Sequence, residues 1–192
     1  ITIIYDTMWN STRRMAECIA EGLREADPTV TVKLFNSAVD DKNDIVTEVF
    51  KSKAILVGSP TINYGYLFSI GGIMEMIRGL KFKNKKAAAF GSYGWSGEAV
   101  KQITALLQGA GFDVVNDGLR CQWNPDQATQ ETCREYGREF AKAVGVSESP
   151  EDDVPTELGD YNNDEQIGQA AKEHFEDWER DAREGVKGGY AG

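Results

Sequence analysis

Short apolar runs alternate with amphipathic segments along the first three quarters of the chain. Most of these runs are continuous, which is typical of strands that are buried on both faces of a parallel sheet. The predicted strands are ITIIY (1–5), VTVKLF (30–35), AILVG (54–58), AAAFG (87–91) and FDVV (112–115), the last of which could continue through residues 119–122. VTVKLF alternates apolar and polar residues instead, as expected of a half-exposed strand at the edge of the sheet.

Between these runs, apolar residues return at the spacing of an amphipathic helix. The predicted helices are 11–26, 40–50, 67–77, 97–109 and 125–144. Strands that alternate with helices indicate a parallel sheet with helices on both faces, and right-handed crossovers restrict its topology. We therefore predict an α/β fold with a doubly wound, five-stranded parallel sheet in the order 2-1-3-4-5, formed by residues 1–144.

Charge divides the chain at its C-terminal quarter. Residues 145–192 hold 14 acidic and four basic side chains. Because the whole chain has 31 acids and 21 bases, residues 1–144 hold 17 of each and are neutral. We expect 145–192 to be an acidic linker followed by an amphipathic helix (165–184), which packs on its own domain or docks to a redox partner. A chain this acidic is not expected to bind nucleic acid.

Cysteine and histidine are too few for most metal centres. The three cysteines, Cys18, Cys121 and Cys133, include no C-x-x-C pair, and His174 is the only histidine. We therefore predict no metal site and no catalytic residue. Reduced thiols, no signal-peptide pattern in ITIIYD and no bilayer-length apolar run favour a cytoplasmic protein that does not bind membranes.

The first candidate binding loop joins the first predicted strand to the first helix. It contains Thr7, Met8, Trp9, Asn10, Ser11 and Thr12. Side-chain hydroxyls stand here beside the N–H groups of a helix N-terminus, a combination that binds anions. The loop has no lysine and neither of the glycine-rich nucleotide patterns, so it favours a small phosphomonoester. Capping of the helix by Ser11 or Thr12 is the alternative explanation.

Two further loops, after the third and fourth predicted strands, combine turn-forming and aromatic residues. The first contains Ser59, Pro60, Thr61, Ile62, Asn63, Tyr64 and Gly65, and the second contains Ser92, Tyr93, Gly94, Trp95, Ser96 and Gly97. Ligands of open α/β sheets bind beyond the carboxyl ends of the strands, where the strand order reverses. Aromatic residues on two loops beside a phosphate site could enclose a flat heterocycle. The loops together favour a planar, phosphorylated cofactor.

These loops resemble those of the flavodoxin superfamily. The stretches YDTMWNST (5–12), GSPTIN (58–63), RGLKFKNKKAAAFG (78–91) and FGSYGWSGEAV (90–100) are similar to one branch, the flavodoxin-like domain of flavodiiron proteins, also called type A flavoproteins. The resemblance covers residues 1–144 and implies a flavodoxin-like fold with one bound FMN.

The resemblance also implies a role for each loop. Thr7 to Thr12 would hold the FMN phosphate, and Ser59 to Asn63 would line the ribityl chain and the ring edge. Ser92 to Gly97 would close over the ring, with Trp95 stacking on it.

Two residues depart from the wider superfamily. Asn10 stands where general flavodoxins have glycine, and Tyr64 stands where many members have a second asparagine, so Tyr64 would pack on the ring or cover its solvent edge. A loop carbonyl near Asn63 to Gly65 would accept a hydrogen bond from N5–H of the reduced ring. Gly65 would allow that peptide to rotate.

The expected function is FMN-dependent electron transfer, and whether the chain is itself an enzyme stays open. Flavodiiron proteins reduce dioxygen or nitric oxide at a di-iron centre in a preceding β-lactamase-like domain, and the start at Ile1 fits a segment cut just after it. The expected partner is a redox protein or domain, namely a di-iron domain, a rubredoxin or a reductase; a homo-oligomer is also compatible with the pattern. Alternatives are a free-standing flavodoxin, an FMN-independent interaction domain on the same fold, and a quinone reductase.

Overall fold

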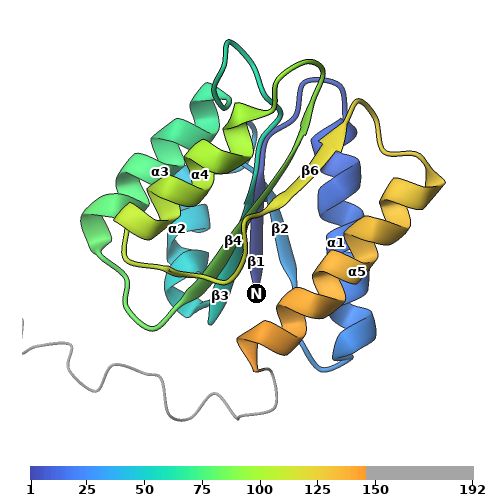
Figure 1. Cartoon of the computed structure of the whole chain (residues 1–192). Helices are drawn as coiled ribbons and strands as arrows, with labels where there is room; N and C mark the ends of the chain where they lie inside the picture. Colours follow the sequence, from blue (N-terminus) through green and yellow to red (C-terminus); the bar gives the residue numbers. More distant parts are fainter. Residues whose placement is uncertain (146–192) are drawn as a thin grey trace, which may run out of the picture. The chain divides into compact units, whose positions relative to one another are not determined.

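The structure is a computed structural model that describes residues 1–145, so the expected linker and helix of the C-terminal extension lie outside the described residues. Strands and helices alternate along the described chain (Figure 1). The elements are β1 (Thr2–Tyr5), α1 (Ser11–Ala26), β2 (Lys33–Asn36), α2 (Lys42–Lys51), β3 (Ala54–Gly58), α3 (Phe68–Leu80), β4 (Lys86–Tyr93), α4 (Glu98–Gly109), β5 (Asp113–Val114), β6 (Leu119–Gln122) and α5 (Gln127–Val144). None of these helices is long and apolar enough to cross a bilayer.

The strands form one parallel sheet in the order β2-β1-β3-β4-β5. In its register, Ile3 of β1 lies opposite Leu34 of β2 on one side and Leu56 of β3 on the other. This confirms the predicted strand order and the position of β2 at the edge. The fifth position is divided, because β5 pairs with the beginning of β4 and β6 pairs with its end.

A tyrosine fills the gap in the hydrogen-bond ladder between β5 and β6. The Tyr136 hydroxyl of α5 lies 3.1 Å from the Ala89 carbonyl oxygen and 2.8 Å from Asn116 Oδ1. Gly118 has a φ of +87°, and a Cβ at this position would lie 2.8 Å from the same carbonyl oxygen. Only glycine fits this left-handed close approach, which lies directly before β6 begins.

Two strand boundaries differ from the predicted ones by more than one residue. β2 begins at Lys33 rather than residue 30, because the Asp27 carboxylate accepts hydrogen bonds from the Thr29 N–H and hydroxyl and holds the chain in a turn. β4 extends to Tyr93 rather than residue 91, because its last residues pair with β6.

The helices cover both faces of the sheet. α1 and α5 lie on one face, and α2, α3 and α4 lie on the other (Figure 1). Because side chains alternate along a strand, Ile3 belongs to the core under α1 and α5, whereas its neighbour Ile4 belongs to the opposite core. Both side chains are fully buried, as predicted for a strand covered on both sides.

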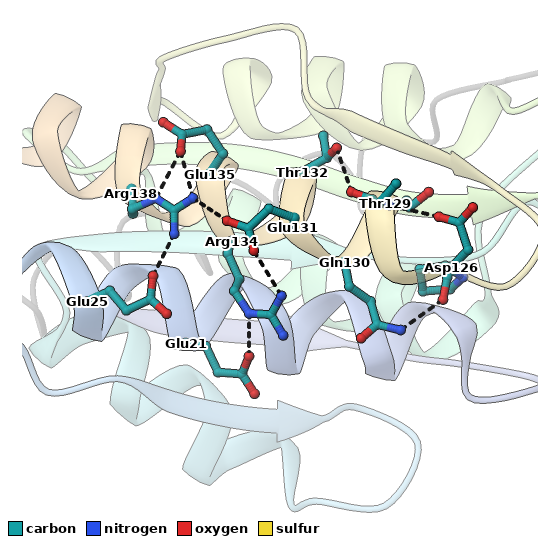
Figure 2. Close-up of polar contacts among 12 residues, drawn as sticks. Glu21, Glu25, Asp126, Thr129, Gln130, Glu131, Thr132, Arg134, Glu135 and Arg138 are labelled. Carbon is teal, nitrogen blue, oxygen red and sulfur yellow. Dashed lines mark hydrogen bonds and ion pairs between the residues drawn. The ribbon is translucent and has the colours of Figure 1, made fainter.

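The α1–α5 pair is held by a close glycine contact and by ion pairs. A Cβ on Gly137 of α5 would lie 2.3 Å from the Ile19 carbonyl oxygen of α1, so the two backbones approach each other closely. Figure 2 shows the ion pairs that join the two helices: Arg134 with Glu21 at 2.8 Å and Arg138 with Glu25 at 2.6 Å, and each arginine is also paired with an acid of α5. Exposed pairs of this kind each contribute little to stability, so we expect the buried backbone contact to contribute more to holding α1 against α5.

Candidate functional site

The three predicted binding loops meet at the carboxyl edge of the sheet (Figure 1). Loops β1–α1, β3–α3 and β4–α4 leave neighbouring strands and remain hydrogen-bonded beyond them. The Asp6 N–H donates to the Gly58 carbonyl at 3.1 Å, and the Thr61 N–H donates to the Ser92 carbonyl at 2.9 Å. The strand order reverses between β1 and β3, so these loops surround the position where ligands of such sheets bind.

The N-terminus of α1 has no side-chain cap. Its N-cap residue is Asn10, with φ 62°, and the Asn10 side chain makes no capping hydrogen bond to the first turn. The Ser11 and Thr12 hydroxyls instead bond the Ser92 hydroxyl of β4, at 2.8 and 3.0 Å. The capping alternative is therefore wrong. The first-turn N–H groups have no partner within the helix and suit an anion. Asparagine is a suitable residue at position 10 because it tolerates a positive φ.

Thr7 supplies a hydroxyl that fits a phosphate. Its Oγ1 is buried and has no hydrogen-bond partner within residues 1–145. The adjacent Asp6 carboxylate accepts hydrogen bonds from the Thr7 backbone N–H at 2.6 Å and from the Ser69 hydroxyl. It therefore stabilises the loop and does not accept a hydrogen bond from the Thr7 hydroxyl. A buried unpaired hydroxyl is unfavourable unless a ligand satisfies it, so this hydroxyl is available as a donor to a ligand at the loop.

The base of loop β3–α3 uses its polar side chains to hold the loop together. The Ser59 hydroxyl is fully buried, donates to the Pro60 carbonyl at 2.9 Å and accepts the Leu67 N–H at 2.9 Å. Thr61 Oγ1 accepts the Ala99 N–H at the start of α4, at 3.3 Å. These contacts make the base of the loop a fixed part of the carboxyl edge.

The tip of the same loop is a tight two-residue turn. The Ile62 and Gly65 backbones donate to each other at 3.0 and 2.8 Å. Asn63 and Tyr64 between them have φ values of 49° and 60°, as the central residues of a type I′ turn do. The Tyr64 carbonyl accepts a hydrogen bond from Gln102 Nε2 of α4 at 2.8 Å, and the Tyr64 side chain is exposed.

Loop β4–α4 is organised around a pair of tryptophans, one of which the sequence analysis missed. Trp95 packs edge-to-face on Trp123, with ring centroids 5.4 Å apart and an interplanar angle of 77°. Trp123 follows β6, and its backbone N–H donates to the Tyr93 carbonyl at 2.8 Å. The feature of the sequence that could have identified Trp123 is its position directly after the predicted strand segment 119–122. A fourth loop, β6–α5, therefore joins the carboxyl edge.

Large aromatic side chains are unusually exposed around these loops. Trp9, Tyr64 and Trp95 expose 85%, 76% and 91% of their surface. Aromatic side chains normally bury most of their area, so their gathering at one edge indicates a binding surface. Within the described residues, no group of three metal-ligating side chains occurs. Glu98, in the first turn of α4, has a buried carboxylate oxygen without a partner among residues 1–145, and it was not among the predicted site residues.

The fold and the loops together define a flavodoxin-like domain: a doubly wound parallel sheet with an uncapped helix N-terminus and aromatic loops at its switch point. The sequence profile of the flavodoxin family matches residues 3–137, and the chain belongs to this family. Membership implies FMN binding.

Known relatives place the chain close to the flavodoxin-like portion of flavodiiron proteins. It is 50% identical over 156 residues to the anaerobic nitric oxide reductase flavorubredoxin of Escherichia coli O1:K1, a match that covers 81% of this chain and 32% of that protein. The chain thus spans about a third of the length of the curated relatives it matches. The rubredoxin oxygen:oxidoreductase of Desulfovibrio gigas superposes with a TM-score of 0.71 at 36% identity, covering 76% of this chain and 36% of that one. An archaeal flavodoxin superposes with a TM-score of 0.66 at 28% identity, covering 76% and 99%.

Proposed function

We propose that residues 1–145 bind one FMN at the carboxyl edge and transfer electrons through it. The observation that carries this proposal is the buried Thr7 hydroxyl without a partner, beside the uncapped N-terminus of α1. Residues Thr7 to Thr12 would hold the phosphate, and Ser59 to Asn63 would line the ribityl chain and the ring edge. Ser92 to Gly97 would close over the ring, with Trp95 stacking on it.

The residues of this site tune the cofactor rather than perform the chemistry. Bound FMN supplies the ability to take up and release electrons one or two at a time. The candidate residues include no lysine or arginine, so they supply no cation to balance the negative charge that reduction would add beside a phosphate. Each tenfold loss of affinity on a one-electron step lowers the potential by about 59 mV. We expect the second one-electron potential to lie below that of free FMN.

The finer role that we propose is to feed electrons to a di-iron centre outside this chain. Relatives named as nitric oxide and oxygen reductases support it, since this chain corresponds to only part of each. One histidine, His174, cannot provide a di-iron ligand set. Redox partners would then be a di-iron domain and a rubredoxin or reductase.

Binding is tested by the visible spectrum of the purified full chain and by titration of its apoprotein. We expect flavin absorption that is released by acid precipitation, and an FMN affinity at least tenfold above that of riboflavin, which lacks the phosphate. A chain that binds neither compound would support the FMN-independent interaction domain. Equal affinities would contradict the proposed phosphate site.

Electron transfer is tested by anaerobic mixing of the reduced, FMN-loaded chain with nitric oxide. Alone, the chain should reoxidise slowly, and addition of the di-iron domain of a flavodiiron relative should accelerate reoxidation. The second candidate function, a free-standing flavodoxin, is favoured by the archaeal flavodoxin, nearly all of which the fold covers. Transfer to small one-electron carriers but not to the di-iron domain would support that candidate.

A further inference from the structure

Helix α4 reaches back to the loop after β3. It begins directly after loop β4–α4, with Gly97 as its N-cap residue, and contacts loop β3–α3 twice. The Ala99 N–H donates to Thr61 Oγ1 at 3.3 Å, and one turn further Gln102 Nε2 donates to the Tyr64 carbonyl at 2.8 Å. One helix therefore supports both of the loops that we assign to the ring.

The peptide between Tyr64 and Gly65 is held at both of its polar groups. Its N–H donates to the Ile62 carbonyl at 2.8 Å, and its C=O accepts from Gln102. Tyr64 has a φ of 60°, which is uncommon for a bulky residue, so the turn needs support from outside itself. Gly65, by contrast, has no Cβ that would oppose rotation of this peptide. The Gln102 side chain is thus the contact from outside the turn that fixes where this carbonyl points.

We infer that Gln102 is a positioning residue for the flavin site, which sets the relative affinity of the domain for oxidised and reduced FMN. The inference rests on the proposed FMN binding. Bound FMN would supply an N5 atom that accepts a hydrogen bond when oxidised and donates one after it has taken up an electron from a reductant and a proton from water, and the Tyr64 carbonyl would be the acceptor on the protein. If the Tyr64 carbonyl turns toward the ring to accept this hydrogen bond, the bond to Gln102 must break. Gln102 therefore opposes the first reduction step.

The test is a redox titration of the FMN-loaded full chain carrying Gln102→Ala. One exposed hydrogen bond corresponds to about a fivefold change in relative affinity. The first one-electron potential should therefore rise by about 40 mV, at about 59 mV per tenfold. In the apoprotein, the Gly65 amide should exchange its proton faster than in the wild type. Gln108→Ala, an exposed and charge-neutral change of the same residue type on the same helix, should alter neither quantity.

Gln102→Glu provides a second, pH-dependent variant. The ionised carboxylate cannot donate to the Tyr64 carbonyl, so at pH 7 this variant should lose the hydrogen bond as Gln102→Ala does, and its Gly65 amide should also exchange faster. Protonated at a pH below its ordinary pKa of about 4.3, the carboxyl group can donate again, and the potential should return toward the wild-type value at the same pH. Such recovery distinguishes a positioning bond from a general loss of structure.

The outcomes separate this inference from the proposed function. If the wild-type chain binds no FMN, the proposed function fails first. If FMN binds to all variants and Gln102→Ala keeps the wild-type first potential, the inference is overturned and the proposed function stands. A Gln108→Ala shift as large as that of Gln102→Ala would overturn it too.

Discussion

Replacement of Thr7 by valine should have opposite effects on the apoprotein and on FMN binding. Valine keeps the branched shape and removes Oγ1, which is buried without a partner. Removal of an unsatisfied buried hydroxyl should raise the apoprotein's free energy of unfolding by about 1 kcal/mol. With FMN bound, the same hydroxyl should donate to the phosphate. Loss of a hydrogen bond to a charged group, about 1.5–3 kcal/mol, should raise the FMN dissociation constant roughly 10- to 150-fold.

The assay combines urea unfolding of the apoprotein with fluorescence titration by FMN and by riboflavin. Because riboflavin has no phosphate, its affinity should be the same for wild type and Thr7→Val. FMN at 100 times its dissociation constant stabilises a folded protein by about 2.7 kcal/mol. At that fixed concentration, a 30-fold weaker variant should keep only about 0.9 kcal/mol of this stabilisation.

Thr2→Val is the matched control at the opposite end of β1. Thr2 is also fully buried, but its hydroxyl is hydrogen-bonded to Ser52. Its loss should lower the apoprotein's stability by about 1 kcal/mol or more and leave FMN affinity unchanged. The reasoning is refuted if Thr7→Val weakens FMN and riboflavin equally, or if it destabilises the apoprotein as Thr2→Val does.

Three further predictions concern the scaffold. Gly137→Ala should lower the free energy of unfolding by about 1–3 kcal/mol in urea titrations, because the added Cβ meets the α1 backbone, whereas Gly72→Ala, with open space in α3, should raise it by about 0.5–1 kcal/mol. Burial raises the pKa of the Cys133 thiol from 9.0 to about 12, so a thiol reagent at pH 8 should modify it only after unfolding. Between these pH values the unfolded chain loses a proton that the folded chain keeps, so the thiol's contribution to stability should decrease as pH rises, as measured by urea titrations from pH 8 to 11. Asn10→Val should cost about 1–2 kcal/mol of apoprotein stability and weaken FMN binding, because φ is 62° there, while Asn10→Gly should be nearly neutral in both measurements.

The amino-acid pattern by itself determined the alternation of strands and helices, the parallel sheet and its order. Continuous apolar runs such as AILVG can be satisfied only between two helical layers, and right-handed crossovers leave few arrangements. The carboxyl ends of parallel strands must share one edge, so the meeting of the loops around Thr7, Thr61 and Trp95 followed from their positions after strands. These inferences need only local periodicity and general rules of chain topology.

Tertiary structure decided what depends on contacts between distant segments. Gln102 and Tyr64 are 38 residues apart, and Tyr136 and Ala89 are 47 apart, so neither bond leaves a trace in local periodicity. The division of the fifth strand, the packing of Trp123 on Trp95 and the unpaired Thr7 hydroxyl likewise depend on which atoms the folded chain brings together. Periodicity records which side of an element is buried, whereas the partner of a particular polar atom is set only when the elements pack.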